Sequence, residues 1–452
     1  MAFVTGITCP VMLYQLKNYL HRRQHRERYR LLDRLLHNQT LSKEQLLIQQ
    51  KLALADIIQH AYSTTPYYQK KYAQSPRNNA HELITDSLPI LHKDEVVQHR
   101  EEMLARNIDK RALSIGHTGG STGKPVSFYY DQHKHEMMRA GMCRSYMWSG
   151  WMPGQKILNF WGARQDILRQ DILHGNSFSQ KYQDYVAAEK TIAAHEYSEA
   201  QLHDWAKSIR SYRPILLQGY ASILAELSRY IIANNIQMPN TILGIYSTAE
   251  MLYDGQRKLM EQAFRCKVFN QYGSREIPNI ACECRHGNQH IFTDMVYLES
   301  QHINQEDRLI ITSLTNKIMP FIRYDIGDSG KLKGGDCACG SPFPMMEMGL
   351  CRSNDLIKTR NGKSIHPSYF NRLLYGQTYI RQYQYVQSEL DKITLNIVSP
   401  IKLQIETINS LKERVRRDID ENMVLEINYV DEIRRSISGK HRFVISNLKI
   451  SN

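Results

Sequence analysis

The sequence predicts an α/β core with parallel strands, preceded by helices and followed by a smaller α+β domain. Between about residues 85 and 350, short apolar runs typical of strands alternate with longer amphipathic runs typical of helices. The strand-like runs include residues 156–161 and 267–270, and helix-like runs begin near Ala221 and Tyr253. Strands that alternate with helices are typical of a parallel sheet with helices on its faces.

The segments on either side of this core have different patterns. Residues from about 10 to 75 carry leucine and isoleucine at helical spacing, and Pro66 interrupts the pattern because proline disfavours helix at the residue before it. Beyond residue 352, two strand-like segments flank a helix, at residues 393–398, 404–420 and 424–430. A chain of 452 residues also exceeds one ordinary hydrophobic core. We therefore expect a helical arm over 1–80 that packs on a large domain over 81–351, and a small α+β domain over 352–452.

The composition favours a globular protein, because 42% of the residues are hydrophobic. No apolar stretch approaches the roughly 20 residues that a membrane span needs. The short apolar run at residues 11–14 precedes the basic residues of positions 17–30, which reverses the order found in a signal peptide. We therefore expect a cytoplasmic enzyme.

The formal net charge of +13 favours anionic partners. The basic residues are dispersed except in the cluster at residues 21–30, and no nucleic-acid-binding motif accompanies them, so we do not expect nucleic acid as a partner. ATP is one anion that fits this charge. A peripheral contact of the basic N-terminal helix with the inner face of the membrane is another. The alternative reading of the cluster is a solvated helix face.

The strongest local motif is a glycine-rich loop at residues 118–125. Its glycines allow the backbone to approach an anion closely, and its hydroxyls and Lys124 can contact phosphate oxygens. It is not a P-loop, because Pro125 follows Lys124 and prevents a helix from starting there as that motif requires. In isolation such a loop can also be a plain turn. The candidate nucleotide-binding residues beside Lys124 are Thr118, Gly119, Gly120, Ser121, Thr122 and Gly123.

Further motifs follow this loop in order, at residues 246–250, 271–276, 323–328, 349–358 and 436–442. Together with the loop they resemble the motifs of the adenylate-forming (AMP-dependent) ligase superfamily. The closer resemblance is to the branch that contains phenylacetate–coenzyme A ligase, coenzyme F390 synthetase and the CapK-type capsular polysaccharide proteins. It extends from about Tyr67 to Arg442, and it implies a large α/β adenylation domain followed by a small mobile α+β domain.

The resemblance implies nucleotide-binding roles for residues of the large domain. Residues 271–276 resemble the Tyr-Gly-x-x-Glu motif, which implies that Tyr272 and Gly273 lie beside the adenine and that Glu276 binds Mg²⁺. Residues 246–250 resemble the strand end that builds the nucleotide and acyl pocket, which implies a role for Ser247 and Glu250.

Three further roles follow from the later motifs. Asp328 resembles the aspartate that accepts hydrogen bonds from the ribose hydroxyls, although an aspartate after glycine can also be a turn residue. Arg352 resembles the arginine of the hinge that contacts the ribose, and Cys351 departs from the pattern by replacing the usual glycine. Residues 436–442 resemble the Ser-x-Gly-Lys-x-Arg motif, which implies that Lys440 is the catalytic lysine of the small domain.

The implied reaction joins a carboxylic acid to AMP, releases pyrophosphate, and then transfers the acyl group. Lys124, Glu276 and Lys440 are the expected catalytic residues. The acceptor is left open between the thiol of coenzyme A or of a carrier protein and an amine or hydroxyl, for example on a sugar. The resemblance to CapK-type proteins favours a role in surface polysaccharide biosynthesis. The alternative is a catalytically silent CapK-like component of a membrane-proximal glycan assembly complex.

Four of the eight cysteines form two close pairs, Cys282 with Cys284 and Cys337 with Cys339. Thiolates and a neutral imidazole are the usual ligands of a structural zinc ion, whereas buried free thiols are the alternative. Some members of the branch carry Cys-x₅-His followed by Cys-x-Cys as a zinc site. This resemblance implies a zinc site that joins two loops, with Cys282 as a rival to the first ligand and His286 facing solvent. The implied ligands are Cys284, His290, Cys337 and Cys339.

The acyl pocket is placed by resemblance alone. It is expected near residues 161–163, 219–220 and 247–248, where Trp161 and Tyr220 are candidate lining residues. An ordinary core position is the alternative for both aromatic side chains. The identity of the acid is not specified by these residues.

Overall fold

The computed structural model describes most of the chain, and for residues 8–14, 306, 350–352 and 364 it describes the backbone alone. The described residues are 8–76, 87–117, 126–161, 186, 188–194, 199–303, 306–352, 357–360, 364–365, 369–370, 373–374, 377, 379–434 and 442–448. The chain divides into two compact units. The first comprises Met1–Ser300, Ile310–Ile326 and Leu332–Glu347, and the second comprises Gln301–Leu309, Gly327–Lys331 and Met348–Asn452.

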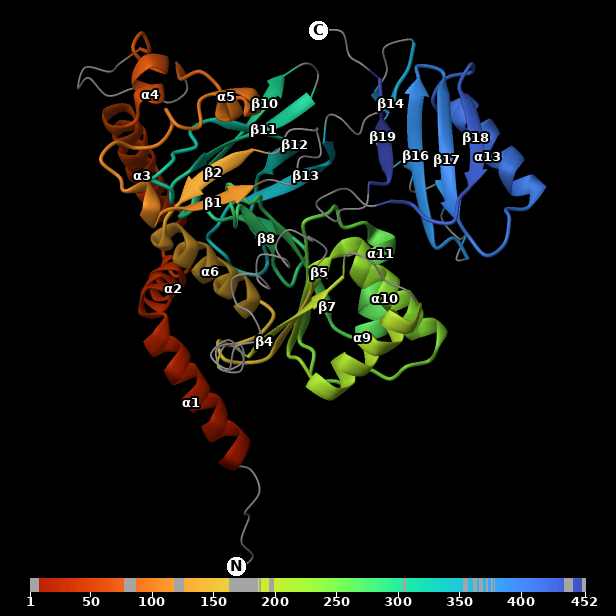
Figure 1. Ribbon diagram of the computed structural model, residues 1–452, viewed down its shortest axis with the longest axis horizontal. Coiled ribbons are helices and arrows are strands. Elements are labelled where there is room, and N and C mark those ends of the chain that lie inside the picture. Colours follow the sequence, from red (N-terminus) through yellow and green to blue (C-terminus); the bar gives the residue numbers. More distant parts are fainter. Residues whose placement is uncertain are drawn as a thin grey trace, which may run out of the picture. The chain divides into compact units, whose positions relative to one another are not determined.

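The first unit begins with four helices (Figure 1). They are α1 (Thr8–Gln24), α2 (Arg26–Asn38), α3 (Lys43–Thr64) and α4 (Pro66–Lys71). Leu31, Leu32 and Leu35, three of the four leucines that predicted α2, are buried. Pro66 occupies the first turn of α4, where its missing N–H has no intrahelical partner in any case. Arg28 of α2 donates from Nε to Glu136 on α6 (Gln132–Met147) over 2.7 Å, so a buried ion pair joins these helices.

Within the described residues, the largest sheet has eleven strands in the order β10-β11-β12-β13-β9-β8-β7-β6-β5-β3-β4. They are β3 (Ile157–Trp161), β4 (Glu189–Ala193), β5 (Leu216–Tyr220), β6 (Gly244–Thr248), β7 (Lys267–Tyr272), β8 (Ala281–Glu283), β9 (Gln289–Ile291), β10 (Val296–Ile303), β11 (Glu306–Ser313), β12 (Tyr324–Lys333) and β13 (Met345–Arg352). Strands β4, β3, β5, β6 and β7 pair in parallel, as the sequence predicts.

The sheet continues beyond β7 with antiparallel pairs, which the sequence pattern did not predict. Strand β7 pairs with β8, β8 with β9, and β9 with β13, each in the antiparallel sense. The connection from β7 to β8 runs over residues 273–280 and contains no helix. A connection this short reverses the chain direction, because a parallel crossover needs a dozen or more residues.

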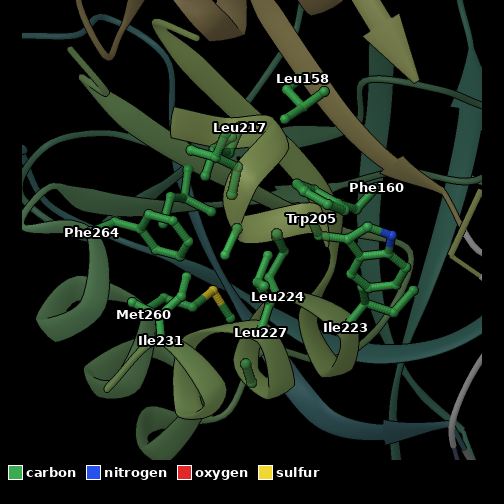
Figure 2. Close-up of a cluster of buried hydrophobic side chains, with 14 of the residues drawn as sticks. Leu158, Phe160, Trp205, Leu217, Ile223, Leu224, Leu227, Ile231, Met260 and Phe264 are labelled. Atoms are coloured by element: carbon green, nitrogen blue, oxygen red, sulfur yellow. The ribbon is translucent and has the colours of Figure 1, made fainter. Parts of the chain in front are cut away.

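Helices cover both faces of the parallel strands. Helices α9 (Glu199–Tyr212), α10 (Ala221–Ala233) and α11 (Asp254–Phe264) pack on one face. Their apolar side chains form one buried cluster with side chains of the strands (Figure 2), including Leu158, Phe160, Trp205, Leu224 and Phe264. On the other face lies α6, where the ring centroid of Tyr146 is 5.1 Å from that of Tyr246 on β6.

A separate antiparallel hairpin precedes α6. It consists of β1 (Ser114–His117) and β2 (Ser127–Tyr130), and it follows the short helices α5 (Lys93–Gln98) and η2 (Lys110–Ala112). The side chain of Asp131 accepts a hydrogen bond from the backbone N–H of Lys134 over 2.8 Å, and so caps the start of α6 directly after the hairpin.

The second unit has its own sheet and core. Strands β14 (Ile357–Lys358) and β15 (Ser364–Ile365) pair with each other, and a four-stranded sheet has the order β18-β17-β16-β19. Its elements are β16 (Gln382–Glu389), β17 (Lys392–Val398), α13 (Ile405–Asp418), β18 (Val424–Tyr429) and β19 (Val444–Ser446). The strand–helix–strand segment that the sequence predicts is therefore β17, α13 and β18.

The fold class that the sequence predicts is confirmed: a large α/β part is followed by a smaller α+β part. Across the part of the chain that the structure describes, no helix combines the length and the apolar character that crossing a membrane requires.

Candidate active site

The carboxyl ends of the parallel strands lie along one edge of the sheet. Gly219 of β5 pairs with Ser247 of β6, and Tyr220 pairs with Thr248, so the strand ends are in register. In sheets of this type, ligands bind outside the carboxyl ends of the strands. The rings of Trp161 and Tyr220 meet here edge to face with their centroids 5.2 Å apart.

Ser247 lies at this edge and is fully buried. Its Oγ has no hydrogen-bond partner among the described residues. Three residues later, the Glu250 carboxylate accepts a hydrogen bond from the backbone N–H of Ser222 over 2.8 Å, at the start of α10. The carboxylate therefore satisfies an N–H group at the first turn of that helix. Gly162 and Ala163, which were expected near the same pocket, lie outside the described residues.

The chain makes a tight turn where it leaves β7. The backbone N–H of Ile280 donates to the carbonyl of Tyr272 over 3.0 Å, and that of Ser274 donates to the carbonyl of Ile277 over 2.9 Å. A Cβ atom on Gly273 would lie 2.9 Å from the backbone nitrogen of Asn279, so only glycine fits without a shift of the chain. The turn brings Glu276 back beside the end of the strand.

Glu276 is buried, with 5% of its surface exposed. Its Oε1 accepts a hydrogen bond from the hydroxyl of Tyr324 over 3.3 Å. Its backbone carbonyl accepts one from Nζ of Lys134 over 2.6 Å. Burial lowers the pKa of Lys134 to about 7, and the carboxylates of Glu276 and Asp131 partly offset that effect.

The glycine-rich loop lies outside the described residues, and so do its candidate ligands Thr118 to Gly123 and Lys124. The structure does describe both ends of the loop. His117 and Ser127 face each other in the hairpin, and Nδ1 of His117 lies 2.8 Å from Oγ of Ser127. Nη1 of Arg275 donates to the carbonyl of His117 over 3.0 Å. The hairpin pair of His117 and Ser127 therefore lies beside the segment that carries Glu276.

The remaining nucleotide-binding candidates belong to the second unit. Asp328 lies in β12 and is half-buried, directly after Gly327, whose φ of +85° favours glycine. Arg352 is the last residue of β13, and only its backbone is described. Lys440 lies outside the described residues.

The cysteine and histidine residues expected to bind zinc lie together. One potential ligand atom from each of the four residues lies within 4.8 Å of those of the other three: Cys284, His290, Cys337 and Cys339. The thiol sulfurs of Cys284 and Cys337 are 3.7 Å apart, and Sγ of Cys339 is 3.3 Å from Nε2 of His290. Three sulfurs and one imidazole nitrogen are a donor set that fits tetrahedral zinc.

The surroundings of these four side chains also fit a metal site. Nδ1 of His290 is 2.8 Å from the carbonyl oxygen of Phe343, which leaves Nε2 directed at the sulfurs. The side-chain amide of Asn288 and the backbone N–H of Cys339 donate to Sγ of Cys337. Burial alone would raise the pKa of Cys337, but these donors outweigh it and lower the pKa to about 6.

Cys282 is separate from this group of four. It is fully buried in β8, its sulfur lies 3.6 Å from the carbonyl of Glu283, and burial raises the pKa of its thiol. Cys284 instead follows the end of β8, in a turn closed by the N–H of Gly287 and the carbonyl of Cys284 over 2.9 Å. His286, which precedes Gly287 in this turn, is exposed as expected.

Two contacts in this site could not be predicted from the sequence. Lys134 reads as an ordinary helix residue, and its partner Glu276 is 142 positions away. Arg275 occupies a variable position of its motif, and its contact with His117 spans 158 positions. Contacts at such separations arise only from the tertiary fold.

Comparison with known proteins agrees with this architecture. Residues 357–447 match the family described as the CapK C-terminal domain. The chain is 25% identical over 375 residues to protein CapK of Staphylococcus aureus, covering 80% of each chain. It is 23% identical over 451 residues to a phenylacetate-coenzyme A ligase of Thermus thermophilus, covering 90% of this chain and 98% of that one.

A solved structure with a similar fold is that of 2-hydroxyisobutyryl-CoA ligase in the postadenylation state, in complex with R3-HIB-AMP. It aligns with a TM-score of 0.69 at 15% identity, and the alignment covers 90% of this chain and 91% of that one. The fold is therefore that of the adenylate-forming ligases. The family match at residues 357–447 and the two relatives support a place in the branch that contains CapK and the phenylacetate–coenzyme A ligases.

Proposed function

We propose that the protein is an ATP-dependent, AMP-forming acid ligase. One carboxylate oxygen of the acid attacks the α-phosphorus of ATP, the bond to pyrophosphate breaks, and an acyl-adenylate forms. The observation that carries the proposal is the contact between Arg275 and the carbonyl of His117. Through this contact His117, the residue before the glycine-rich loop, lies beside the segment that carries Glu276, which supports a site where phosphate and Mg²⁺ bind together.

The chemistry of the step is mainly positioning and charge neutralisation. Lys124 and the backbone N–H groups of its loop would hold the β- and γ-phosphates. Glu276 offers a buried carboxylate, a hard oxygen ligand that fits Mg²⁺. Bound there, Mg²⁺ would supply positive charge to the phosphate oxygens. Tyr272 and Gly273 would flank the adenine, with Ser247 and Glu250 at the neighbouring strand ends.

Residues of the second unit complete the proposed mechanism. Asp328 and Arg352 would bind the ribose, and Lys440 would contact both the acid and the α-phosphate. The acyl group then passes to an acceptor that we propose to be the thiol of coenzyme A or of a carrier, or an amine or hydroxyl. The resemblance of the motifs to those of CapK-type capsular polysaccharide proteins supports a role of this reaction in surface polysaccharide biosynthesis.

The experiment that tests the function is pyrophosphate release from ATP and Mg²⁺ across a panel of carboxylic acids, amino acids and uronic acids. We expect one acid to stimulate release. Lys440→Ala should slow that release by about 100-fold or more while ATP still binds. Arg434→Ala is the matched control, because this exposed arginine lies near the same segment and has no proposed role. Full activity of Lys440→Ala would contradict the mechanism.

Failure with every acid would have a different meaning. If ATP binds but no acid stimulates pyrophosphate release, the alternative of a catalytically silent CapK-like assembly component gains support. The intact set of Lys124, Glu276, Asp328 and Lys440 argues against that alternative, because a scaffold has no use for all four.

The proposal includes a peripheral contact of α1 with an anionic membrane. Helix α1 contains no acidic residue and ends with His21, Arg22 and Arg23. Leu16 and Tyr19 on the same helix are 53% and 60% exposed. Exposed apolar side chains next to a basic cluster fit a helix that lies at an anionic lipid surface.

Vesicle sedimentation tests this contact. We expect the full chain to bind phosphatidylglycerol vesicles, to bind phosphatidylcholine vesicles weakly, and to be released by salt. Leu16→Glu should weaken binding, whereas Leu332→Glu, which replaces an equally exposed leucine on β12, should not. Equal binding of the two variants to anionic vesicles would exclude α1 as the contact.

A further inference from the structure

Lys134 is a buried cation to which the proposed chemistry assigns no role. Only 4% of its surface is exposed. Its Nζ lies 2.6 Å from the carbonyl oxygen of Glu276 and 4.6 Å from the ring centroid of Phe128. An ammonium group loses its hydration on burial, so a lysine at such a position is unfavourable unless its contacts compensate.

The two contacts of Lys134 connect separate parts of the candidate site. Glu276 belongs to the turn after β7, and Phe128 belongs to β2, the strand that follows the glycine-rich loop. Lys134 itself stands in the first turn of α6, which Asp131 caps through the backbone N–H of Lys134. One side chain therefore links the start of α6, the return strand of the hairpin and the backbone of Glu276.

The atom of Glu276 that accepts the hydrogen bond from Lys134 indicates the role of this lysine. The ammonium group of Lys134 binds the main-chain carbonyl of Glu276 and not its carboxylate. The carboxylate accepts a hydrogen bond at Oε1 from the hydroxyl of Tyr324. A donor on the carbonyl fixes the backbone without occupying the side-chain oxygens that a metal ion would use. Partners that orient a ligand in this way commonly affect metal affinity strongly.

We infer that Lys134 is a positioning residue for the magnesium–nucleotide site, which it serves by holding the backbone of Glu276 in register with the hairpin of the glycine-rich loop. This inference rests on the proposed function for the identity of the ligand. The local effect on the backbone does not depend on that function.

The first test is hydrogen exchange of the full chain without ligand. In Lys134→Met, which keeps the length of the side chain but removes the charge and the donor, amides of residues 273–277 should exchange about tenfold faster than in the wild type. The control is Lys156→Met. Lys156 also donates to a backbone carbonyl, that of Tyr212 over 2.9 Å, and also lies over an aromatic ring, 5.0 Å from its centroid. Unchanged exchange at 273–277 in a folded Lys134→Met protein would overturn the inference.

The second test separates positioning from general packing. ATP affinity is measured with and without Mg²⁺. The affinity of Lys134→Met for ATP should be about tenfold lower than that of the wild type in the presence of Mg²⁺, and much less reduced in its absence. The affinity of Lys156→Met should equal that of the wild type in both conditions. An equal loss in both conditions would overturn the positioning role. If Lys134→Met does not fold, Lys134→Gln replaces it in both tests, with the same expected direction. Should the wild type bind no ATP, the proposed function fails, and the exchange data still decide the role of Lys134.

Discussion

Gly273 shows how a single atom constrains the site. A Cβ at this position would lie 2.9 Å from the backbone nitrogen of Asn279 and 3.4 Å from backbone atoms of Pro278. Backbone cannot rotate away as a flexible side chain can. The absence of a side chain at Gly273 is therefore what allows the turn after β7 to close and to place Glu276.

We expect Gly273→Ala to lower the free energy of unfolding by about 1–3 kcal/mol, as overpacking of a close contact does. It should also raise the KM for ATP, because the shifted turn carries Glu276. Gly334→Ala is the matched control, since a Cβ there meets nothing within 4 Å. Thermal denaturation and the pyrophosphate assay measure the two effects. A Gly273→Ala protein as stable as the control would contradict the steric argument.

At the scale of single residues, the sequence predicted the local motif of the nucleotide site but not the hydrogen bonds to main-chain atoms. The motif around Tyr272 and Glu276 is local, so its residue types and order are visible without a structure. The hydrogen bond from Lys134 to the carbonyl of Glu276 is not, because a main-chain acceptor leaves no pattern of residue types. Ser247 and Glu250 were both expected at the pocket. The contact of Glu250 with the first turn of α10 was not foreseen, because its donor is a main-chain N–H, which leaves no pattern of residue types either.

At the scale of elements, strand geometry distinguishes the two candidate cysteines that spacing left equivalent. Cys282 lies within β8 and pairs with Gln271 and His290 in the sheet, whereas Cys284 has left the strand and entered the turn. Residues two positions apart on one strand point to the same face, so sequence spacing could not separate them. The end of β8 before Cys284 allows that side chain to approach Cys337.

We expect about one zinc ion per chain, held between the β8–β9 turn and the segment before β13. Cys284→Ser should remove the zinc and lower Tm by roughly 5 °C or more, because the four ligands join loops that are about fifty positions apart. A strong chelator should lower the Tm of the wild type in the same way. Mass spectrometry of the native protein and thermal denaturation provide the measurements.

Cys282→Ser is the matched control for Cys284→Ser, and it should retain zinc. Cys266→Ser is a further control, because this thiol lies in the segment before β7 and is not one of the four clustered side chains. Full zinc content in Cys284→Ser together with loss of zinc in Cys282→Ser would reverse the ligand assignment. Wild-type protein without zinc would exclude the site.

At the scale of the whole molecule, the sequence predicted a smaller α+β part after the large α/β part but not all the strands of that smaller part. Segments β17, α13 and β18 have the alternating or helical apolar patterns that make elements visible. Strand β16 reads Gln-Tyr-Gln-Tyr-Val-Gln-Ser-Glu, and its buried side of Tyr385 and Gln387 includes a polar residue. Strand β19 has three residues, too few for a period. Both strands are recognised only from their pairing in the structure, where β16 pairs with β17 and β19 pairs with β16.

The second unit has a hydrophobic core separate from that of the parallel sheet. Its buried residues come from β14, from residues 370–380 and from β16 through β19, and they include Phe370, Tyr385, Leu395, Val415 and Val444. Helix α13 connects β17 to the parallel strand β18, so this part contains a complete strand–helix–strand unit. The match to the CapK C-terminal domain, residues 357–447, begins with β14 and ends just after β19.

From this we predict that a fragment of residues 353–452 folds on its own. Its core is contributed by elements within the fragment, and domains of about 100 residues commonly fold alone. The fragment should show mixed α/β far-ultraviolet circular dichroism and one cooperative thermal transition. Leu395→Asp, which places a charge at a fully buried position of β17, should abolish the transition, whereas Ile405→Asp at the 68% exposed start of α13 should preserve it. A soluble fragment without a cooperative transition would mean that the core needs residues 301–309 or 327–331 of the same unit to fold.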